Sequence, residues 1–287
     1  MSAPKVVLSK RLKHVLALIS PHAAVADVGC DHGYLAIELL QSYKAEYVIA
    51  MDVNAGPLAR ARENRDRYGF SDKIETRLSD GMEALVPGEV QSVVCAGMGG
   101  KTICGIIGRS RLLVQTLDEL VLQPQSELHI VRRYLRENGF RIAAEDMVLE
   151  DGKFYPMMRV VPICQSDGKS DGAEGGYRAD GESPEVETEG GCHADGESPE
   201  VETEGGCHAD GESSDADAEQ RQRVEDWYGP CLLAEKHPVL QRYLQKEKAV
   251  CTQILHNLEQ ADSEKGTERR QELLQRLSDI AFAERMG

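Results

Sequence analysis

Ten consecutive residues, Val25 to Tyr34, have the types expected of a ligand-binding turn. They read Val-Ala-Asp-Val-Gly-Cys-Asp-His-Gly-Tyr, so an apolar segment ends in one glycine and a second glycine precedes a helical segment. Gly29 and Gly33 lack a Cβ and let the backbone approach a ligand closely. Asp27 and Asp31 would repel a pyrophosphate but attract the ammonium and sulfonium groups of S-adenosylmethionine, and the third glycine of a dinucleotide-binding turn is missing. The run therefore predicts a site for a cationic cofactor.

Three further loops follow apolar segments in a regular order. Asp52 comes 19 residues after Gly33, close to the spacing of about 20 expected for an acidic residue that binds ribose hydroxyls. Ser79-Asp80-Gly81 follows the next segment, and Ala96-Gly97-Met98-Gly99-Gly100 the one after it. Asp52 could instead be a helix N-cap, and Ser79 to Gly81 an ordinary turn. Four candidate loops in this order favour a ligand site over turns that bind nothing.

Strand and helix patterns alternate in the first 139 residues. Apolar residues at helical spacing from Leu8 to Ile19 predict an amphipathic helix. The segments that follow are predicted as strands at 23–28, 47–51, 74–78, 91–96 and 119–122, and as helices at 34–42, 57–68 and 128–138. Such alternation indicates parallel βαβ units. Two strand-like runs, 140–149 and 154–162, are joined by a turn that contains Asp-Gly and predict an antiparallel hairpin.

The negative charge of the chain is concentrated in one segment. Residues 165–219 contain 18 of the 49 acidic side chains and two of the 33 basic ones, so they account for the formal net charge of −16. Within them, Ala179 to His193 recurs unchanged as Ala194 to His208. A repeat this polar cannot bury enough apolar surface to fold, and we predict a disordered linker. Its two Cys-His pairs recur with the repeat, and we do not expect them to bind zinc.

The last part of the chain has the pattern of a helical hairpin. Apolar residues recur at spacings of three and four from Leu240 to Leu258, interrupted by Glu247, and again from Leu273 to Ile280. This pattern predicts two helices with a partial coiled-coil seam. The sequence thus divides into a cofactor-binding domain at 1–164, the acidic linker at 165–219 and a helical, coiled-coil-like domain at 220–287.

Four segments together resemble one bacterial family. They are Leu8-Ser9-Lys10-Arg11-Leu12, Asp27 to Tyr34, Ala96 to Gly100 and Leu122-Gln123-Pro124. Through them, residues 5–162 resemble the TrmK family of tRNA (adenine-N1)-methyltransferases, which modify the adenosine at the twenty-second tRNA nucleotide. The loop from Ala96 stands where many amino-methylating enzymes have Asp/Asn-Pro-Pro-Tyr. The sequence departs from the family at Gly33, where alanine is frequent, at Gln125, where asparagine is usual, and in the acidic repeat.

The resemblance implies an α/β fold: a Rossmann-type class I methyltransferase sheet, parallel with a C-terminal antiparallel hairpin, followed by a helical hairpin. It implies S-adenosyl-L-methionine as cofactor, bound by Asp27, Gly29, Cys30, Asp31, Gly33, Tyr34, Asp52, Val53, Asp80, Gly81 and Ala96. The substrate side would comprise Gly97, Met98, Gly99, Gly100, Lys10 and Arg11. Asp31 and His32 are candidate catalytic residues for polar contacts around the proton that the methylated ring loses, with purely structural turn roles as the alternative.

The resemblance makes tRNA the expected partner. Basic side chains that could contact its phosphates are Lys5, Lys10, Arg11, Lys13, Arg132, Arg133, Arg136, Arg269 and Arg270, although such residues are more often solvated faces of helices. None of the eight cysteines forms a CxxC pair, and no apolar run reaches membrane-span length, so we expect a cytoplasmic monomer without metal. A methyltransferase for a small molecule and a non-catalytic cofactor-binding adaptor remain alternatives.

Overall fold

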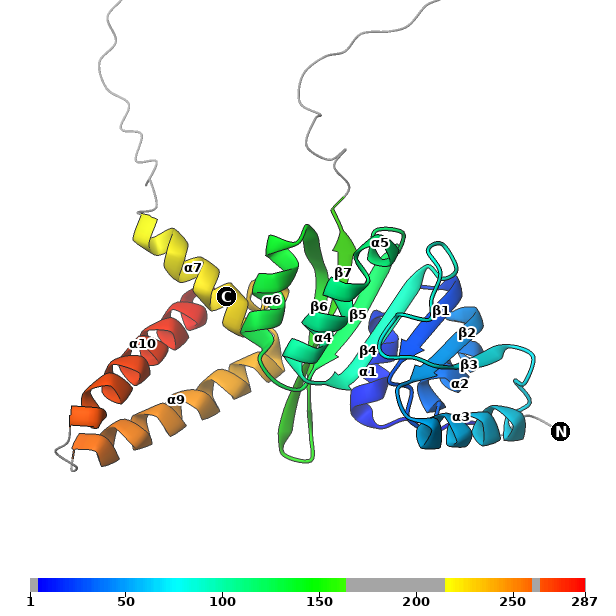
Figure 1. The fold of residues 1–287 in the computed structure, drawn as a ribbon. Coiled ribbons are helices and arrows are strands. Elements are labelled where there is room, and N and C mark those ends of the chain that lie inside the picture. Colours follow the sequence, from blue (N-terminus) through cyan, green and yellow to red (C-terminus); the bar gives the residue numbers. More distant parts are fainter. Residues whose placement is uncertain (1–4, 164–214, 260–263, 287) are drawn as a thin grey trace, which may run out of the picture. The chain divides into compact units, whose positions relative to one another are not determined.

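The computed structural model describes residues 5–163, 215–259 and 264–286 (Figure 1). In chain order the elements are α1 (Lys10–Leu18), β1 (His22–Val28), α2 (Tyr34–Gln41), β2 (Ala45–Asp52), α3 (Ala55–Arg67), β3 (Ile74–Leu78), β4 (Ser92–Met98), α4 (Gly100–Arg109), α5 (Arg111–Val114), β5 (Glu119–Pro124), α6 (Leu128–Glu137), β6 (Phe140–Glu150), β7 (Lys153–Pro162), α7 (Asp215–Tyr228), α8 (Pro230–Ala234), α9 (Pro238–Glu259) and α10 (Glu264–Met286). The acidic repeat with its Cys-His pairs lies outside the described residues. Helix α7 begins at Asp215, inside the segment 165–219 that we predicted as a linker.

One seven-stranded sheet organises residues 22–162. Its strand order is β3-β2-β1-β4-β5-β7-β6. β1 is parallel to both β2 and β4, whereas β7 is antiparallel to β5 and β6. This arrangement confirms the predicted Rossmann-type sheet with a terminal antiparallel hairpin. The chain runs from β1 to β2 on one side and from β4 to β5 on the other, so the strand order reverses between β1 and β4. In open α/β sheets, ligands bind outside the carboxyl ends of the strands where the order reverses.

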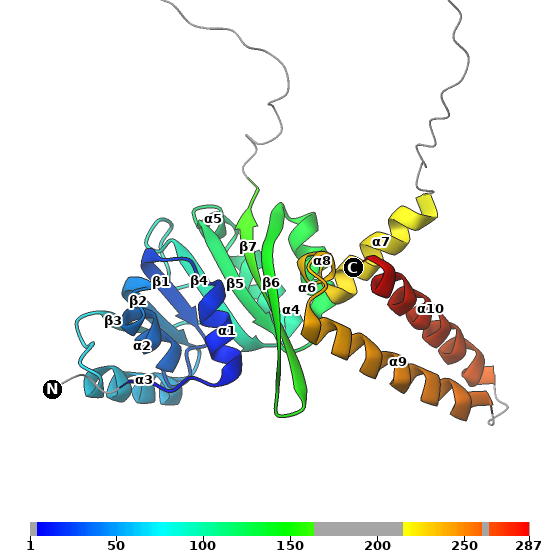
Figure 2. The same ribbon diagram turned by 180° about the vertical axis from the view of Figure 1, so that it is seen from behind.

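Helices cover both faces of the sheet, which explains its continuous apolar strands. One core contains Ile103, Ile106 and Val131 from α4 and α6, which lie on the face seen in Figure 1. The other contains Val15 and Leu35 from α1 and α2, which lie on the face seen in Figure 2. Helices α4 and α5 have no clear pattern in the sequence and were not predicted. Three glycines lower the helix propensity of α4, and burial of its isoleucines against the sheet outweighs them.

The N-terminus of α1 is held by the tip of the β6–β7 hairpin. The two carboxylate oxygens of Glu150 accept hydrogen bonds from the backbone N–H groups of Lys10 and Arg11, at 2.6 and 3.1 Å. Ser9 Oγ accepts a third, from Leu12 N at 3.2 Å. These acceptors satisfy N–H groups that have no partner inside the helix, and a negative charge is favourable at this end of it. The start of α1 is therefore fixed relative to the sheet.

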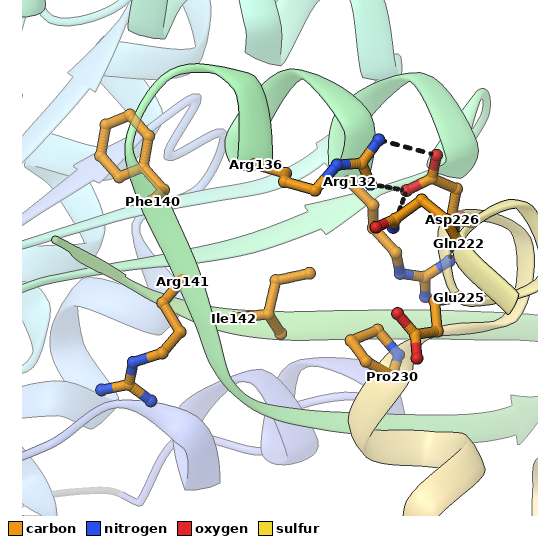
Figure 3. Close-up of a pocket in the computed structure, with 9 residues that line it drawn as sticks. All are labelled: Arg132, Arg136, Phe140, Arg141, Ile142, Gln222, Glu225, Asp226 and Pro230. Atoms are coloured by element: carbon orange, nitrogen blue, oxygen red, sulfur yellow. Dashed lines mark hydrogen bonds and ion pairs between the residues drawn. The ribbon is translucent and has the colours of Figure 1, made fainter. Parts of the chain in front are cut away.

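A buried ion pair joins the sheet to the C-terminal helices. Arg132 Nε of α6 lies 2.9 Å from Glu145 Oε1 of β6, and both side chains are almost completely buried. Arg132 also donates to the carbonyl oxygens of Asp226 and Trp227, at 3.0 and 2.9 Å. Figure 3 shows Arg132 of α6 beside Asp226 of α7. Glu145 Oε2 accepts from Cys231 N at 3.0 Å. The expectation that Arg132 contacts RNA is therefore wrong, because its guanidinium is enclosed by protein.

Helices α9 and α10 contact each other, as predicted for a helical hairpin. Glu247, which interrupts the apolar pattern of α9, accepts a hydrogen bond from the hydroxyl of Tyr228 at 2.9 Å. Arg276 Nε of α10 donates to the same carboxylate at 2.7 Å, and its guanidinium lies 3.5 Å from the centre of the Trp227 ring. The interruption is thus a polar link between α7, α9 and α10.

Candidate functional site

A cavity of about 250 Å³ opens at the carboxyl ends of β1 and β4. The ends of β1 and β4, the turn after β1, the first turns of α1 and α2 and the residue after β5 line it. These residues are Arg11, Leu12, Asp27, Gly29, Cys30, Asp31, His32, Tyr34, Leu35, Ala96, Gly97 and Gln125. Most of these residues were predicted from the sequence. Leu12, Leu35 and Gln125 were not, although Gln125 follows the Leu-Gln-Pro segment that was singled out. The cavity lies at the point where the topology of the sheet favours ligand binding.

Asp27 is the most deeply buried charged group of the cavity. Its side chain is 3% exposed, and Oδ2 has no hydrogen-bond partner. Burial, and secondly the charge of Asp52, raise the pKa of Asp27 from 3.8 to about 7. A buried polar atom without a partner is costly. Asp27 therefore offers an acceptor that a cationic ligand in the cavity would satisfy.

The turn after β1 is attached to the neighbouring strand. The N–H groups of Gly29 and Cys30 both donate to the carbonyl oxygen of Met51, at 2.8 and 2.9 Å. A Cβ at Gly29 would collide with the methyl group of Met98. Gly29 also has a φ of +77°, in the region that favours glycine, so the turn requires glycine here even though the Met98 side chain of β4 is flexible. Gly33 instead precedes α2 and lies against Ala61 of α3. It therefore allows close packing of two helices and does not face the cavity.

Four residues predicted to bind the cofactor, Asp52, Val53, Asp80 and Gly81, do not line the cavity. They lie at the carboxyl ends of β2 and β3, along the same edge of the sheet as the cavity. Asp52 Oδ1 accepts from Asn54 N at 2.9 Å, while the carbonyl oxygen of Asp52 accepts from Ser79 N at 3.0 Å. Val53 and Leu78 are 60% and 61% exposed. Acidic groups beside exposed apolar side chains suit a ligand with hydroxyl groups and a flat ring.

Two other predicted residues on this edge have protein partners. Asp80 Oδ1 lies 3.1 Å from Arg109 Nη2 of α4, in a pair that is largely exposed. A Cβ at Gly81 would meet Ile106 of the same helix at 2.8 Å. The structure therefore shows a packing role for Gly81, and it leaves Asp80 accessible from solvent.

The loops after β4 and β5 form one unit beside the cavity. Gln125 N donates to the carbonyl oxygen of Met98 at 2.8 Å. Glu127 pairs with Lys101 Nζ at 2.9 Å and accepts from Lys101 N at 3.2 Å. A Cβ at Gly100 would lie only 2.6 Å from the carbonyl oxygen of Ser126. Of the five residues that we predicted as a loop here, the first three lie at the end of β4. Ala96 and Gly97 line the cavity, whereas Met98 and Gly100 contact the segment after β5.

Arg11 reaches the cavity from α1. Its Nη1 donates to Gln123 Oε1 at 2.6 Å, and its guanidinium lies 5.7 Å from the centre of the Tyr155 ring. Lys10 does not line the cavity, and its Nζ donates to Leu149 O at 3.3 Å. The predicted catalytic pair, Asp31 Oδ2 and His32 Nε2, is 3.6 Å apart and substantially exposed at the cavity wall. This arrangement allows polar contacts with a ligand and assigns no proton transfer.

A second cavity, of about 280 Å³, lies where α6 and β6 meet the C-terminal helices. Figure 3 shows that Arg136 reaches Asp226 there, and the two form an ion pair. None of the residues predicted to bind the cofactor lines this second cavity, so we assign the chemistry to the first. In the described part of the chain, three or more His, Cys, Asp or Glu side chains nowhere gather in a way that could hold a metal ion. None of the described helices is both long and apolar enough to cross a membrane.

Comparison with known proteins places this geometry among methyltransferases. Residues 8–158 match the family model described as a methyltransferase domain. The tRNA (adenine(22)-N(1))-methyltransferase of Bacillus subtilis is 32% identical over 151 residues, which are 53% of this chain and 63% of that enzyme. The chain therefore matches less than two thirds of the length of that relative.

Solved structures extend the likeness to the C-terminal helices. Streptococcus pneumoniae Sp1610, a proposed tRNA (m1A22) methyltransferase, is 27% identical, with a TM-score of 0.71 over 96% of this chain and 99% of Sp1610. Its complex with S-adenosyl-L-methionine has a TM-score of 0.67 with the same coverage. The similarity thus includes a structure in which that ligand is bound.

Proposed function

Because the chain belongs to the methyltransferase-domain family, we propose that it transfers a methyl group from S-adenosylmethionine to N1 of an adenine in the D-arm region of tRNA. The observation that supports this most directly is the likeness to Sp1610, which covers sheet and helical tail alike. The B. subtilis relative has the same specificity in its name. The substrate also makes the cytoplasm the expected compartment.

The residues of the cavity fit S-adenosylmethionine. Asp27 has the buried, unpartnered oxygen that a cationic group would satisfy. Gly29 has no side chain, and a ligand could approach its backbone once the flexible Met98 side chain that lies over it moves aside. Asp52, Val53 and Asp80 on the adjoining edge would hold the ribose and adenine. Cys30, Asp31, Tyr34 and Ala96 complete the proposed contacts.

The proposed reaction needs alignment more than acid–base chemistry. The cofactor, when bound, supplies an electrophilic methyl group whose bond to sulfur breaks as the N1 lone pair forms a new bond to carbon. Ala96 and Gly97 border the cavity with backbone groups and little side-chain bulk, so a flat base can lie beside them. Alignment of this kind can lower a barrier by about 7–11 kcal/mol. Asp31 and His32, which line the cavity, would make polar contacts around the proton that the methylated, cationic ring then loses.

The proposed tRNA surface begins at α1. Arg11 lines the cavity, while Lys5, Lys10 and Lys13 on the same stretch are exposed. A target base inside the duplex would have to leave its stack to reach the cavity, and nearby cations would hold the phosphates beside it. Binding should therefore weaken steeply as salt is added, because phosphate contacts release counterions.

The test is methylation of unmodified total tRNA by the full chain with labelled cofactor. N1 methylation blocks Watson–Crick pairing, so reverse transcriptase should stop or misincorporate at one D-arm adenine, and nucleoside analysis should identify 1-methyladenosine. A methyl group on an exocyclic amine, a ribose or a guanine would contradict the proposed specificity. Cofactor binding without turnover on tRNA would favour an adaptor, and turnover on a small molecule alone would favour a different methyltransferase.

A further inference from the structure

Two glutamines on either side of Pro124 have opposite surroundings. Gln123 is fully buried, and both ends of its amide are used: Oε1 accepts from Arg11 at 2.6 Å and Nε2 donates to Pro124 O at 3.1 Å. Gln125 is exposed and lines the cavity. Among the hydrogen bonds of the described residues, none involves its side-chain amide. The second amide is therefore available to a ligand.

The backbone of Gln125 is held in place although its side chain is exposed. Its N–H group donates to Met98 O at 2.8 Å, which ties it to the end of β4. Two residues later, the ion pair of Glu127 with Lys101 fixes the same segment to the start of α4. The amide nitrogen of Gln125 lies 3.6 Å from the point that a Cβ on Gly97 would occupy. A neutral donor and acceptor is thus presented directly beside Gly97 at the cavity.

The proposed reaction determines which edge of the base remains free for recognition. N1 must face the methyl donor, so the Watson–Crick edge is directed into the site and the Hoogsteen edge, with N6 and N7, points elsewhere. A glutamine amide matches that edge of adenine, since Oε1 accepts from the N6 amino group while Nε2 donates to N7. Guanine presents two acceptors there, and Oε1 would face one of them unpaired. The guanidinium of Arg11 offers donors alone and a carboxylate offers acceptors alone, so neither provides such a pair.

We propose that Gln125 recognises the target adenine through its Hoogsteen edge and thereby aims N1 at the methyl donor. This inference rests on the proposed function, and it makes Gln125 a specificity-determining residue of that reaction.

The test is a double-mutant cycle in which the Gln125 amide is removed from the protein and the N7 acceptor is removed from the adenine. The full chain is assayed on a tRNA transcript that contains either adenine or 7-deazaadenine at the methylated position, where a C–H group replaces the N7 acceptor. We expect 7-deazaadenine to lower kcat/KM of the unaltered protein about 3- to 10-fold, the effect of one lost hydrogen bond. For Gln125→Met, which has a similar shape but no amide, the two transcripts should differ less than about 2-fold.

Gln115→Met is the matched control, because Gln115 is exposed and precedes β5, at the end opposite to Gln125. It should retain the full 7-deazaadenine effect. Calorimetry should show unchanged affinity of Gln125→Met for S-adenosylmethionine, which a merely structural lesion would lower. An equal penalty in Gln125→Met and the unaltered protein, or no penalty in either, overturns the inference while the proposed function stands. No N1 methylation of the adenine transcript by the unaltered protein overturns both.

Discussion

Asp27 combines burial with an unsatisfied oxygen, and this couples its ionisation to stability. Burial raises its pKa from 3.8 to about 7, so the folded protein retains a proton that the unfolded chain releases between these pH values. Its contribution to stability is therefore complete below pH 4 and is lost as the pH rises toward 7. A cationic ligand favours the ionised form, so cofactor affinity should rise over the same range.

The substitution Asp27→Asn separates these effects. It removes the titrating group, so the free energy of unfolding of the unliganded variant should not fall with pH as that of the unaltered protein does. Between pH 4 and pH 8, the difference in free energy of unfolding between the two should change by about 2–4 kcal/mol in favour of the variant. Its affinity for S-adenosylmethionine should fall, because the negative charge is lost. Denaturant unfolding and calorimetry at both pH values measure the two effects. Parallel pH dependences of stability would show that Asp27 does not titrate in this way.

Asp52 tests the ribose contact proposed for the edge beside the cavity. We expect Asp52→Ala to weaken cofactor binding by roughly 1.5–3 kcal/mol, about 10- to 150-fold in affinity, since charge-assisted hydrogen bonds are lost. The fold should persist, because the side chain of Asp52 contacts only Asn54 N among the hydrogen bonds described. Calorimetry measures the affinity and thermal unfolding checks the fold. Unchanged affinity in a folded variant would remove Asp52 from the site.

At the scale of elements, the start of α4 decides how the loops after β4 and β5 meet. Gly100 leaves no room for a side chain, because a Cβ would lie 2.6 Å from Ser126 O and 2.9 Å from Val131. Backbone cannot yield as a flexible side chain can. The glycines of this segment therefore have two roles. Gly97 leaves the cavity wall open, and Gly100 allows close contact with the segment after β5.

Two substitutions in α4 form a matched pair. Gly100→Ala should destabilise the protein by about 1–3 kcal/mol and lower activity, because the loop that holds Gln125 must move. At Gly105 in the same helix, a Cβ would meet only the end of Arg109 at 3.5 Å, so Gly105→Ala should stabilise by about 0.4–1 kcal/mol. Chemical denaturation and methylation rates compare the two. Equal stability changes would mean that the loops are not rigidly joined.

At the scale of the whole molecule, the buried Arg132–Glu145 ion pair is one of several polar contacts between the sheet layer and the C-terminal helices, beside Arg136–Asp226 and His237–Asp146. Arg132 and Glu145 use their remaining hydrogen-bonding groups on the backbone of α7 and α8. A Cβ at Gly229 would strike the Glu145 carboxylate, so the chain passes close to it there. Loss of either charge would leave the other buried without compensation, which is more costly than the net contribution of the pair.

We expect Arg132→Met to cost about 3–5 kcal/mol and to increase hydrogen exchange in α7 and α8. Arg221→Met removes an exposed arginine from α7, whose pair with Glu225 spans 3.7 Å, and should cost less than about 0.5 kcal/mol. Unfolding measurements and hydrogen exchange distinguish the two variants. Similar small effects would show that the tail is held by its apolar contacts and its other ion pairs, and not by Arg132.

The sequence by itself determined the features that depend on local order along the chain. Alternating strand and helix patterns predicted the parallel sheet, the Asp-Gly turn predicted its antiparallel hairpin, and the turn from Gly29 to Gly33 located the cavity. These follow because backbone periodicity and turn chemistry are properties of neighbouring residues.

Only the tertiary structure decided which side chains meet across distant segments. Arg132 and Arg11 look alike in the sequence, yet one is buried against Glu145 and the other lines the cavity. Likewise Gln123 and Gln125 are two residues apart, and the fold buries the first while it exposes the second. Burial and pairing depend on the packing of whole elements, and no local pattern specifies that packing.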